Sequence, residues 1–116
     1  MQTDEIAYLA AAIDADGWIG IYRAPPCRSR TSAHYRYWVR VALQQGEPEA
    51  VTLAQGVFGG AVHVRKLTPT AWHPGYHWEA NGSGAESALR ALLPYLRIKR
   101  RQAEYALRVR AVLGDG

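Results

Sequence analysis

The chain has 116 residues, about half of them hydrophobic, and carries a net charge of +4. This length fits one domain covering residues 1–116, and the composition is globular rather than disordered. No apolar run approaches the roughly 20 residues that span a bilayer, and no secretion signal opens the chain. We expect a protein of the cytoplasm, nucleoid or organelle matrix that is neither secreted nor membrane-bound. The single cysteine, Cys27, excludes an intrachain disulfide.

The first half of the chain predicts one helix, two strands and a second helix. Residues 4–14 form an apolar helix that Thr3 can cap and that Gly17 ends, so it is expected to be buried on more than one side. Residues 18–23 and 34–43 are predicted strands, joined by a loop rich in proline and serine. The second strand alternates strictly between an apolar face and a face with arginines. A further helix is predicted from Pro48 to about Phe58.

The second half predicts the same order of elements. Strands are expected over residues 61–67 and 76–80, separated by a turn region. Ser83 to Glu86 matches a capping box, which predicts a helix over residues 85–93. The last helix is expected from residue 98 or 99 to Leu113, with an apolar stripe formed by Ala103, Ala106, Val109 and Leu113.

These elements predict an α+β fold with one four-stranded, twisted antiparallel sheet and all helices on one face. Two long stretches of the chain, 17–46 and 50–78, contain no acidic residue but several arginines and histidines. The open face of the sheet is therefore expected to be basic. Such a face favours a polyanionic partner, and a β-ribbon fits the major groove of DNA.

Residues Leu9–Gly17 read LAAAIDADG, which matches seven of the nine positions of the motif LAGLIDADG. The chain resembles the LAGLIDADG family of homing endonucleases, and a second, weaker match lies at Leu96–Ala103. The resemblance implies the αββαββα fold and site-specific cleavage of both strands of DNA. Because the motif occurs once, it also implies a homodimer on a near-palindromic site, with Ala7, Ala10, Ala11 and Asp14 at the interface between motif helices.

The end of the motif is the expected active site. Asp16 stands at the carboxyl end of a helix, where the helix dipole disfavours an anion unless a cation binds it. The resemblance implies that Asp16 and the carbonyl of Ala15 bind Mg²⁺, for which Mn²⁺ substitutes. Asp14 is instead expected to cap the turn or to bond to backbone near it. No small-molecule cofactor is expected.

Two further catalytic residues follow from the resemblance. Lys99 matches the family lysine that stabilises charge in the transition state or organises waters. A polar residue near the end of the second strand orients water in many family members. A register without gaps gives Leu43, which cannot do so; Gln44 is our first candidate and Gln45 the second.

The resemblance also implies that alternating side chains of all four strands contact double-stranded DNA, with Arg suited to guanine and Glu to cytosine. Carried over by alternation, with two loop arginines added, these are Tyr22, Arg28, Arg30, His34, Arg36, Trp38, Arg40, His63, Arg65, His77 and Glu79.

Two alternatives remain open at this stage. A non-cleaving relative, an RNA-splicing maturase or a DNA-binding regulator, would share the fold, although the retained Asp16 favours cleavage. An unrelated small α+β enzyme or interaction module is disfavoured by the acid-free sheet face.

Overall fold

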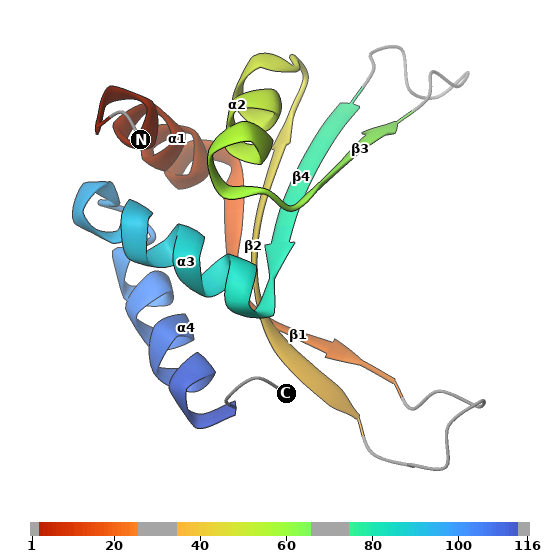
Figure 1. The fold of residues 1–116 in the computed structure, drawn as a ribbon, viewed down its shortest axis with the longest axis vertical. Coiled ribbons are helices and arrows are strands. Elements are labelled where there is room, and N and C mark those ends of the chain that lie inside the picture. The colour runs from red at the N-terminus through yellow and green to blue at the C-terminus, as the bar shows by residue number, and fades with distance from the viewer. Residues whose placement is uncertain (1–2, 26–34, 66–74, 114–116) are drawn as a thin grey trace.

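The computed structural model describes residues 3–25, 35–65 and 75–113. They form four α-helices, one short 3₁₀ helix and four strands in the predicted order (Figure 1). In chain order these are α1 (Thr3–Asp16), β1 (Gly17–Ala24), β2 (Arg36–Gln45), α2 (Glu49–Phe58), β3 (Ala61–Arg65), β4 (Gly75–Asn81), α3 (Gly82–Leu92), η1 (Leu93–Tyr95) and α4 (Arg100–Leu113).

The four strands form one antiparallel sheet in the order β1-β2-β4-β3. Each hairpin thus contributes an outer strand and an inner strand, and the inner strands β2 and β4 pair in the middle. The helices lie together on one side of this sheet (Figure 1). The predicted α+β class, the antiparallel sheet and the one-sided placement of the helices are confirmed.

The core lies between the sheet and the helices. Val39, Val41 and Leu43 alternate along β2 and are completely buried, as is Trp78 on β4. Trp78 is the largest buried side chain, and its indole N–H donates a hydrogen bond to the carbonyl of Gly59 at 2.8 Å, which satisfies its polar atom. Since side chains alternate between the two faces of a strand, burial of these positions sends their sequence neighbours to the open face.

The start of α3 differs from the prediction. The helix begins at Gly82, with Asn81 in the N-cap position, so Ser83 lies inside the helix and its predicted capping box is wrong. Gly82 has a φ of +57°, a conformation that glycine adopts without strain, and this lets the helix start directly after β4.

The predicted stripe of α4 is only partly confirmed. Ala103 and Ala106 are fully buried, but Leu113 is exposed, and Arg110 is buried instead. Its Nε donates a hydrogen bond to Glu86 Oε1 on α3 at 3.1 Å. A buried guanidinium paired with a carboxylate is therefore part of the contact between α3 and α4. Among the residues that the structure describes, no helix is long and apolar enough to cross a membrane.

Candidate active site and nucleic-acid interface

The last turn of α1 carries Asp14, whose carboxylate binds backbone N–H groups. Oδ2 accepts a hydrogen bond from Arg97 N at 2.8 Å, and Oδ1 accepts one from Lys99 N at 2.9 Å. Both donors belong to the segment that leads into α4. Asp14 thus joins the end of α1 to the start of α4, and it bonds to backbone as predicted.

These contacts lower the pKa of the Asp14 carboxyl below its ordinary value of 3.8. Desolvation by burial acts in the opposite direction and raises the pKa. The N–H groups of Arg97, Lys99 and Ile98, together with the charge of Lys99, outweigh it because all of them stabilise the carboxylate form. Asp14 is therefore an ionised structural residue at neutral pH.

Asp16, one half-turn further on, has different surroundings. Asp16 is exposed, and its Oδ2 accepts a hydrogen bond of 2.8 Å from Nε2 of Gln45, at the end of β2. Lys99 Nζ donates to the backbone carbonyl of Asp14 at 2.7 Å. Asp16, Gln45 and Lys99 thus come from three distant parts of the sequence and gather around the end of α1.

The two adjacent glutamines of β2 take different positions. Gln45 reaches Asp16, whereas Gln44 is exposed and pairs with His77 of β4 on the open face of the sheet. Alternation along the strand separates them, because neighbouring side chains point to opposite faces. The structure therefore brings our second candidate, Gln45, to the carboxylate and leaves our first candidate, Gln44, among the side chains of the open face.

The end of α1 offers oxygen atoms to a hard cation. Asp16 and Ala15 are both exposed there, and carboxylate and carbonyl oxygens are suitable ligands for Mg²⁺. No group of three or more His, Cys, Asp or Glu residues able to hold a metal occurs in the described parts of the chain. The exposed oxygens of Asp16 and Ala15 therefore fit a hard cation by their chemistry.

The open face of the sheet collects most of the predicted DNA-contacting residues. The strand register aligns Tyr22 with Trp38, and His63 with His77, so their side chains share a face. The described members of the predicted set that this face brings together are Tyr22, Arg36, Trp38, Arg40, His63, Arg65, His77 and Glu79.

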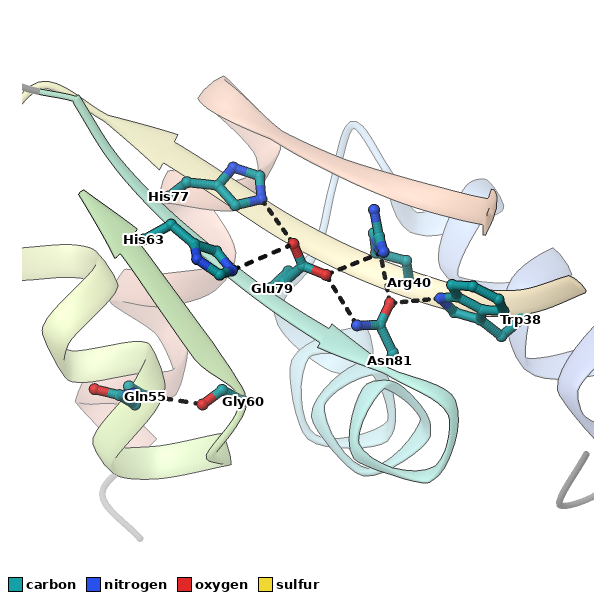
Figure 2. A network of polar contacts seen from close by, with 8 residues as sticks. All are labelled: Trp38, Arg40, Gln55, Gly60, His63, His77, Glu79 and Asn81. Atoms are coloured by element: carbon teal, nitrogen blue, oxygen red, sulfur yellow. Dashed lines mark hydrogen bonds and ion pairs between the residues drawn. The ribbon is translucent and has the colours of Figure 1, made fainter. Parts of the chain in front are cut away.

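A polar network occupies the centre of this face (Figure 2). Glu79 Oε2 lies 3.1 Å from Arg40 Nη2, and Glu79 Oε1 lies 3.3 Å from His77 Nε2 and 4.0 Å from His63 Nε2. Asn81 Nδ2 donates to Glu79 Oε2 at 2.9 Å. Arg40 and Glu79, both predicted to contact DNA, are thus paired with each other in this structure.

The network keeps Glu79 charged. The hydrogen bond from Asn81 is the largest influence and lowers the pKa of the Glu79 carboxyl below its ordinary value of 4.5. Partial burial opposes this shift, and the charge of Arg40 and the contact with His77 add to it. One anion is therefore fixed in the middle of this face, so the expectation of an acid-free sheet face is wrong.

Aromatic rings support the cations beside the network. The Arg40 guanidinium lies 4.0 Å from the centre of the Tyr22 ring, and Tyr22 and Trp38 pack at 4.9 Å between ring centres. Arg36 lies 5.6 Å from the centre of Trp38. Cation–π contacts of this kind orient a guanidinium without neutralising its charge.

No family model matches the chain, and neither does any curated protein sequence. Solved structures do match. One of them is the homing endonuclease I-CvuI in complex with the I-CreI target in the presence of Mg, a structure in which the DNA is not cleaved. Its TM-score with this chain is 0.72 at 25% sequence identity. That match covers 92% of this chain and 66% of I-CvuI. The archaeal intron-encoded homing endonuclease I-Vdi141I, complexed with DNA, gives a TM-score of 0.70 at 15% identity, over 95% of this chain and 69% of that one.

The LAGLIDADG homing endonuclease I-LtrWI, bound to target DNA, also matches, with a TM-score of 0.58 over 97% of this chain. The chain has the fold of the LAGLIDADG homing endonucleases. The resemblance found in the motif is thereby confirmed at the level of the whole fold. The chain spans about two thirds of the length of I-CvuI.

In the LAGLIDADG fold observed here, the predicted dimer residues separate into two groups. Ala7 and Ala11 are accessible and line a cavity of about 510 Å³ with Asp14, and with Tyr95, Arg97 and other residues around η1. Ala10 is completely buried in the core of its own chain. The expectation for Ala10 is therefore corrected, because a side chain without exposed surface cannot contact a second molecule.

Three predicted DNA contacts, Arg28, Arg30 and His34, lie outside the described residues. Two residues of the open face were missed by sequence reasoning. Trp18 is 46% exposed, and Asn81 lies one residue past the predicted end of the fourth strand but belongs to β4. Extending the alternation of β4 from His77 and Glu79 by two positions would have placed Asn81 on the same face.

Proposed function

We propose that the chain is a site-specific DNA endonuclease that hydrolyses phosphodiester bonds as a Mg²⁺-dependent homodimer on a near-palindromic site. The observation that carries this proposal is the exposed carboxylate of Asp16 at the end of α1, contacted by Gln45. The open face of the sheet carries arginine, histidine and aromatic side chains. The likeness to homing endonucleases in complex with DNA supports the same conclusion.

Asp16 and the Ala15 carbonyl would hold the metal ion. Bound Mg²⁺ supplies Lewis-acid stabilisation of charge on the phosphate and lowers the pKa of a coordinated water. One chain offers few ligands, so the site is proposed to form between the Asp16 residues of two copies and the scissile phosphates. Two carboxylates brought close together repel each other at low dielectric, and a cation between them removes this repulsion.

The other residues at the end of α1 take supporting roles in this proposal. Gln45 donates its Nε2 hydrogen to Asp16 and keeps its carbonyl oxygen as an acceptor for a water molecule. It is therefore assigned the orientation of the attacking water, and Gln44 joins the DNA-contacting residues. Lys99, held by the Asp14 carbonyl, supplies positive charge for the developing charge of the phosphate.

The open face is proposed to bind the major groove of each half-site. Arg40 and Arg65 suit guanine edges, and Glu79 suits the amino group of cytosine. The remaining contacts are assigned to Tyr22, Arg36, Trp38, His63 and His77. Arg28, Arg30 and His34 are proposed to contact the flanking DNA.

A second copy of the chain is the proposed partner at the exposed side of α1. Ala7 and Ala11 have small side chains, which permit a close approach of two helices. Asp14 and the residues around η1 would border this contact.

Selection of cleaved molecules from a random DNA library with Mg²⁺ tests the proposed function. The expected result is one near-palindromic family of sites that is cut in both strands. Binding of a defined sequence without cleavage would instead indicate a regulator. Preferential binding of RNA would indicate a maturase, and both results would contradict the proposal.

A further inference from the structure

Asn81 has the backbone of an N-cap residue but does not use its side chain as one. It precedes α3 with extended dihedral angles, φ −130° and ψ 154°, and makes no side-chain hydrogen bond to the helix. Asparagine in this position normally accepts an N–H of the first turn. The side chain of Asn81 lies instead on the open face of the sheet (Figure 2).

There the amide joins three side chains of two strands. Asn81 Oδ1 accepts hydrogen bonds from Arg40 Nε at 2.7 Å and from Trp38 Nε1 at 2.8 Å. Asn81 Nδ2 donates to Glu79 Oε2 at 2.9 Å. The reversed amide would set its NH₂ group against two donors and its oxygen against a carboxylate, so these contacts fix its orientation.

The contacts of Arg40 leave a defined part of its guanidinium open to a ligand, and they hold the Glu79 carboxylate beside it. Arg40 uses Nε toward Asn81 and Nη2 toward Glu79, and its guanidinium is stacked on Tyr22. Nη1 is not engaged in any of these three contacts. Arg40 and Glu79 retain only 20% and 17% side-chain exposure. A guanidinium edge and a carboxylate are therefore presented side by side in one orientation.

We propose that Asn81 is a positioning residue that couples Arg40 and Glu79 into one unit that recognises a G·C pair in each half-site. The guanidinium donates to O6 or N7 of guanine, and the carboxylate accepts from N4 of cytosine. The inference rests on the proposed function. It assigns to Asn81 a part in sequence discrimination, with no direct contact to the cleaved phosphate.

The test compares base preferences of wild-type protein and Asn81→Ser, measured with Ca²⁺ over all single-base variants of the selected site. Serine remains a favourable N-cap residue, so α3 is expected to keep its stability, but its side chain is too short to reach Arg40 and Glu79. Preference for G·C at one position per half-site is expected to fall roughly 5- to 10-fold. Affinity for unrelated DNA is expected to stay within about twofold.

A double variant tests whether Asn81 acts through Arg40. If it does, Asn81→Ser adds little further loss of preference once Arg40→Ala is present, because coupled residues are not additive. Independent, additive losses would overturn the inference. Asn81→Asp is a second variant for the case that serine impairs folding, since it keeps the acceptor but sets a carboxylate against Glu79; it is expected to lose the same preference.

An unchanged base preference in Asn81→Ser would overturn the positioning role. So would an equal loss of affinity for all sequences, which is the behaviour of a backbone anchor. Both results leave the proposed endonuclease function standing, provided that the wild-type protein selects a site. A wild-type protein without any sequence preference would contradict the proposed function itself and this inference with it.

Discussion

Asp14 and Asp16 are two residues apart in one motif but have opposite environments. The carboxylate of Asp14 accepts two backbone hydrogen bonds, and that of Asp16 is exposed and accepts one from Gln45. A helix end explains the division, because successive residues there point in different directions. Asp14 therefore contributes to the stability of the fold, whereas the carboxylate of Asp16 remains accessible to a ligand.

Asp14→Asn is expected to reduce the free energy of unfolding by about 1–2 kcal/mol, because hydrogen bonds to a charged group are replaced by weaker ones. The folded-state pKa of Asp14 is lowered, so its contribution is present above the unfolded value of 3.8 and is lost as pH falls through the folded-state pKa. Urea denaturation at several pH values measures this. The difference between wild type and variant should be largest above about pH 5 and shrink in acid; a difference that grows in acid would contradict the stabilising role of the Asp14 carboxylate.

Gln45→Ala and Gln44→Ala form a matched pair that separates catalysis from DNA contact. Gln45→Ala is expected to lower the single-turnover cleavage rate roughly 100-fold with little change in affinity, because it removes the group assigned to orient water. Gln44→Ala should instead alter affinity or base preference. Cleavage kinetics and binding titrations on one selected site measure both effects, and the opposite pattern would return the catalytic role to Gln44.

Single residues were predictable where a motif or an alternation fixed them. The backbone-bonding role of Asp14 and the shared face of Arg40, His77 and Glu79 followed from sequence. The position of Gln45 did not, because it depends on how far β2 extends past Leu43. Alternation along β4 could have placed Asn81 on the open face, but its contacts cross from β4 to β2, and sequence carries no signal for that register.

Gly17 connects α1 to β1 without any loop. A Cβ atom on this residue would lie 2.8 Å from Ile13 Cα and from the Ile13 carbonyl oxygen. Backbone atoms cannot move aside as a flexible side chain can. The glycine of the motif is therefore required by the close approach of helix and strand that positions Asp16.

Gly17→Ala is expected to cost about 1–3 kcal/mol of stability, as overpacking against rigid atoms does. Gly46→Ala is the matched control, because a Cβ atom there meets nothing within 4 Å. Chemical denaturation of the two variants measures the difference. Equal stability of both variants would contradict the tight junction between α1 and β1.

Helices and strands with a clear period of hydrophobic residues were predicted, but the residues at which they begin and end were not. Strand β2 was recognised from strict alternation, but it extends to Gln45. The start of α3 was misplaced because a capping-box pattern at Ser83 competed with Gly82, whose positive φ allows an earlier start. The buried pair of Arg110 and Glu86 was not predictable, since arginine and glutamate normally indicate a solvent-exposed helix face.

The molecule as a whole presents one half of the proposed site. Ala7 and Ala11 leave a surface of small side chains on α1, next to the cavity near η1.

Ala11→Leu is expected to weaken self-association at least 10-fold by blocking close helix approach. Ala111→Leu, an exposed alanine at the end of α4, is the control. Sedimentation measures both; a wild-type chain that stays monomeric when bound to its full site would contradict the dimer.

Cleavage by Asp16→Asn shows whether the Asp16 carboxylate is needed for the proposed metal-dependent reaction. Wild-type and variant protein are incubated with the selected DNA site and Mg²⁺, and strand cleavage and binding are measured in parallel. The variant is expected to bind with nearly wild-type affinity, because loss of the carboxylate also removes repulsion between the two sites, and to cut at least 10³-fold more slowly. Cleavage by Asp16→Asn at the wild-type rate would show that this carboxylate does not hold the catalytic metal.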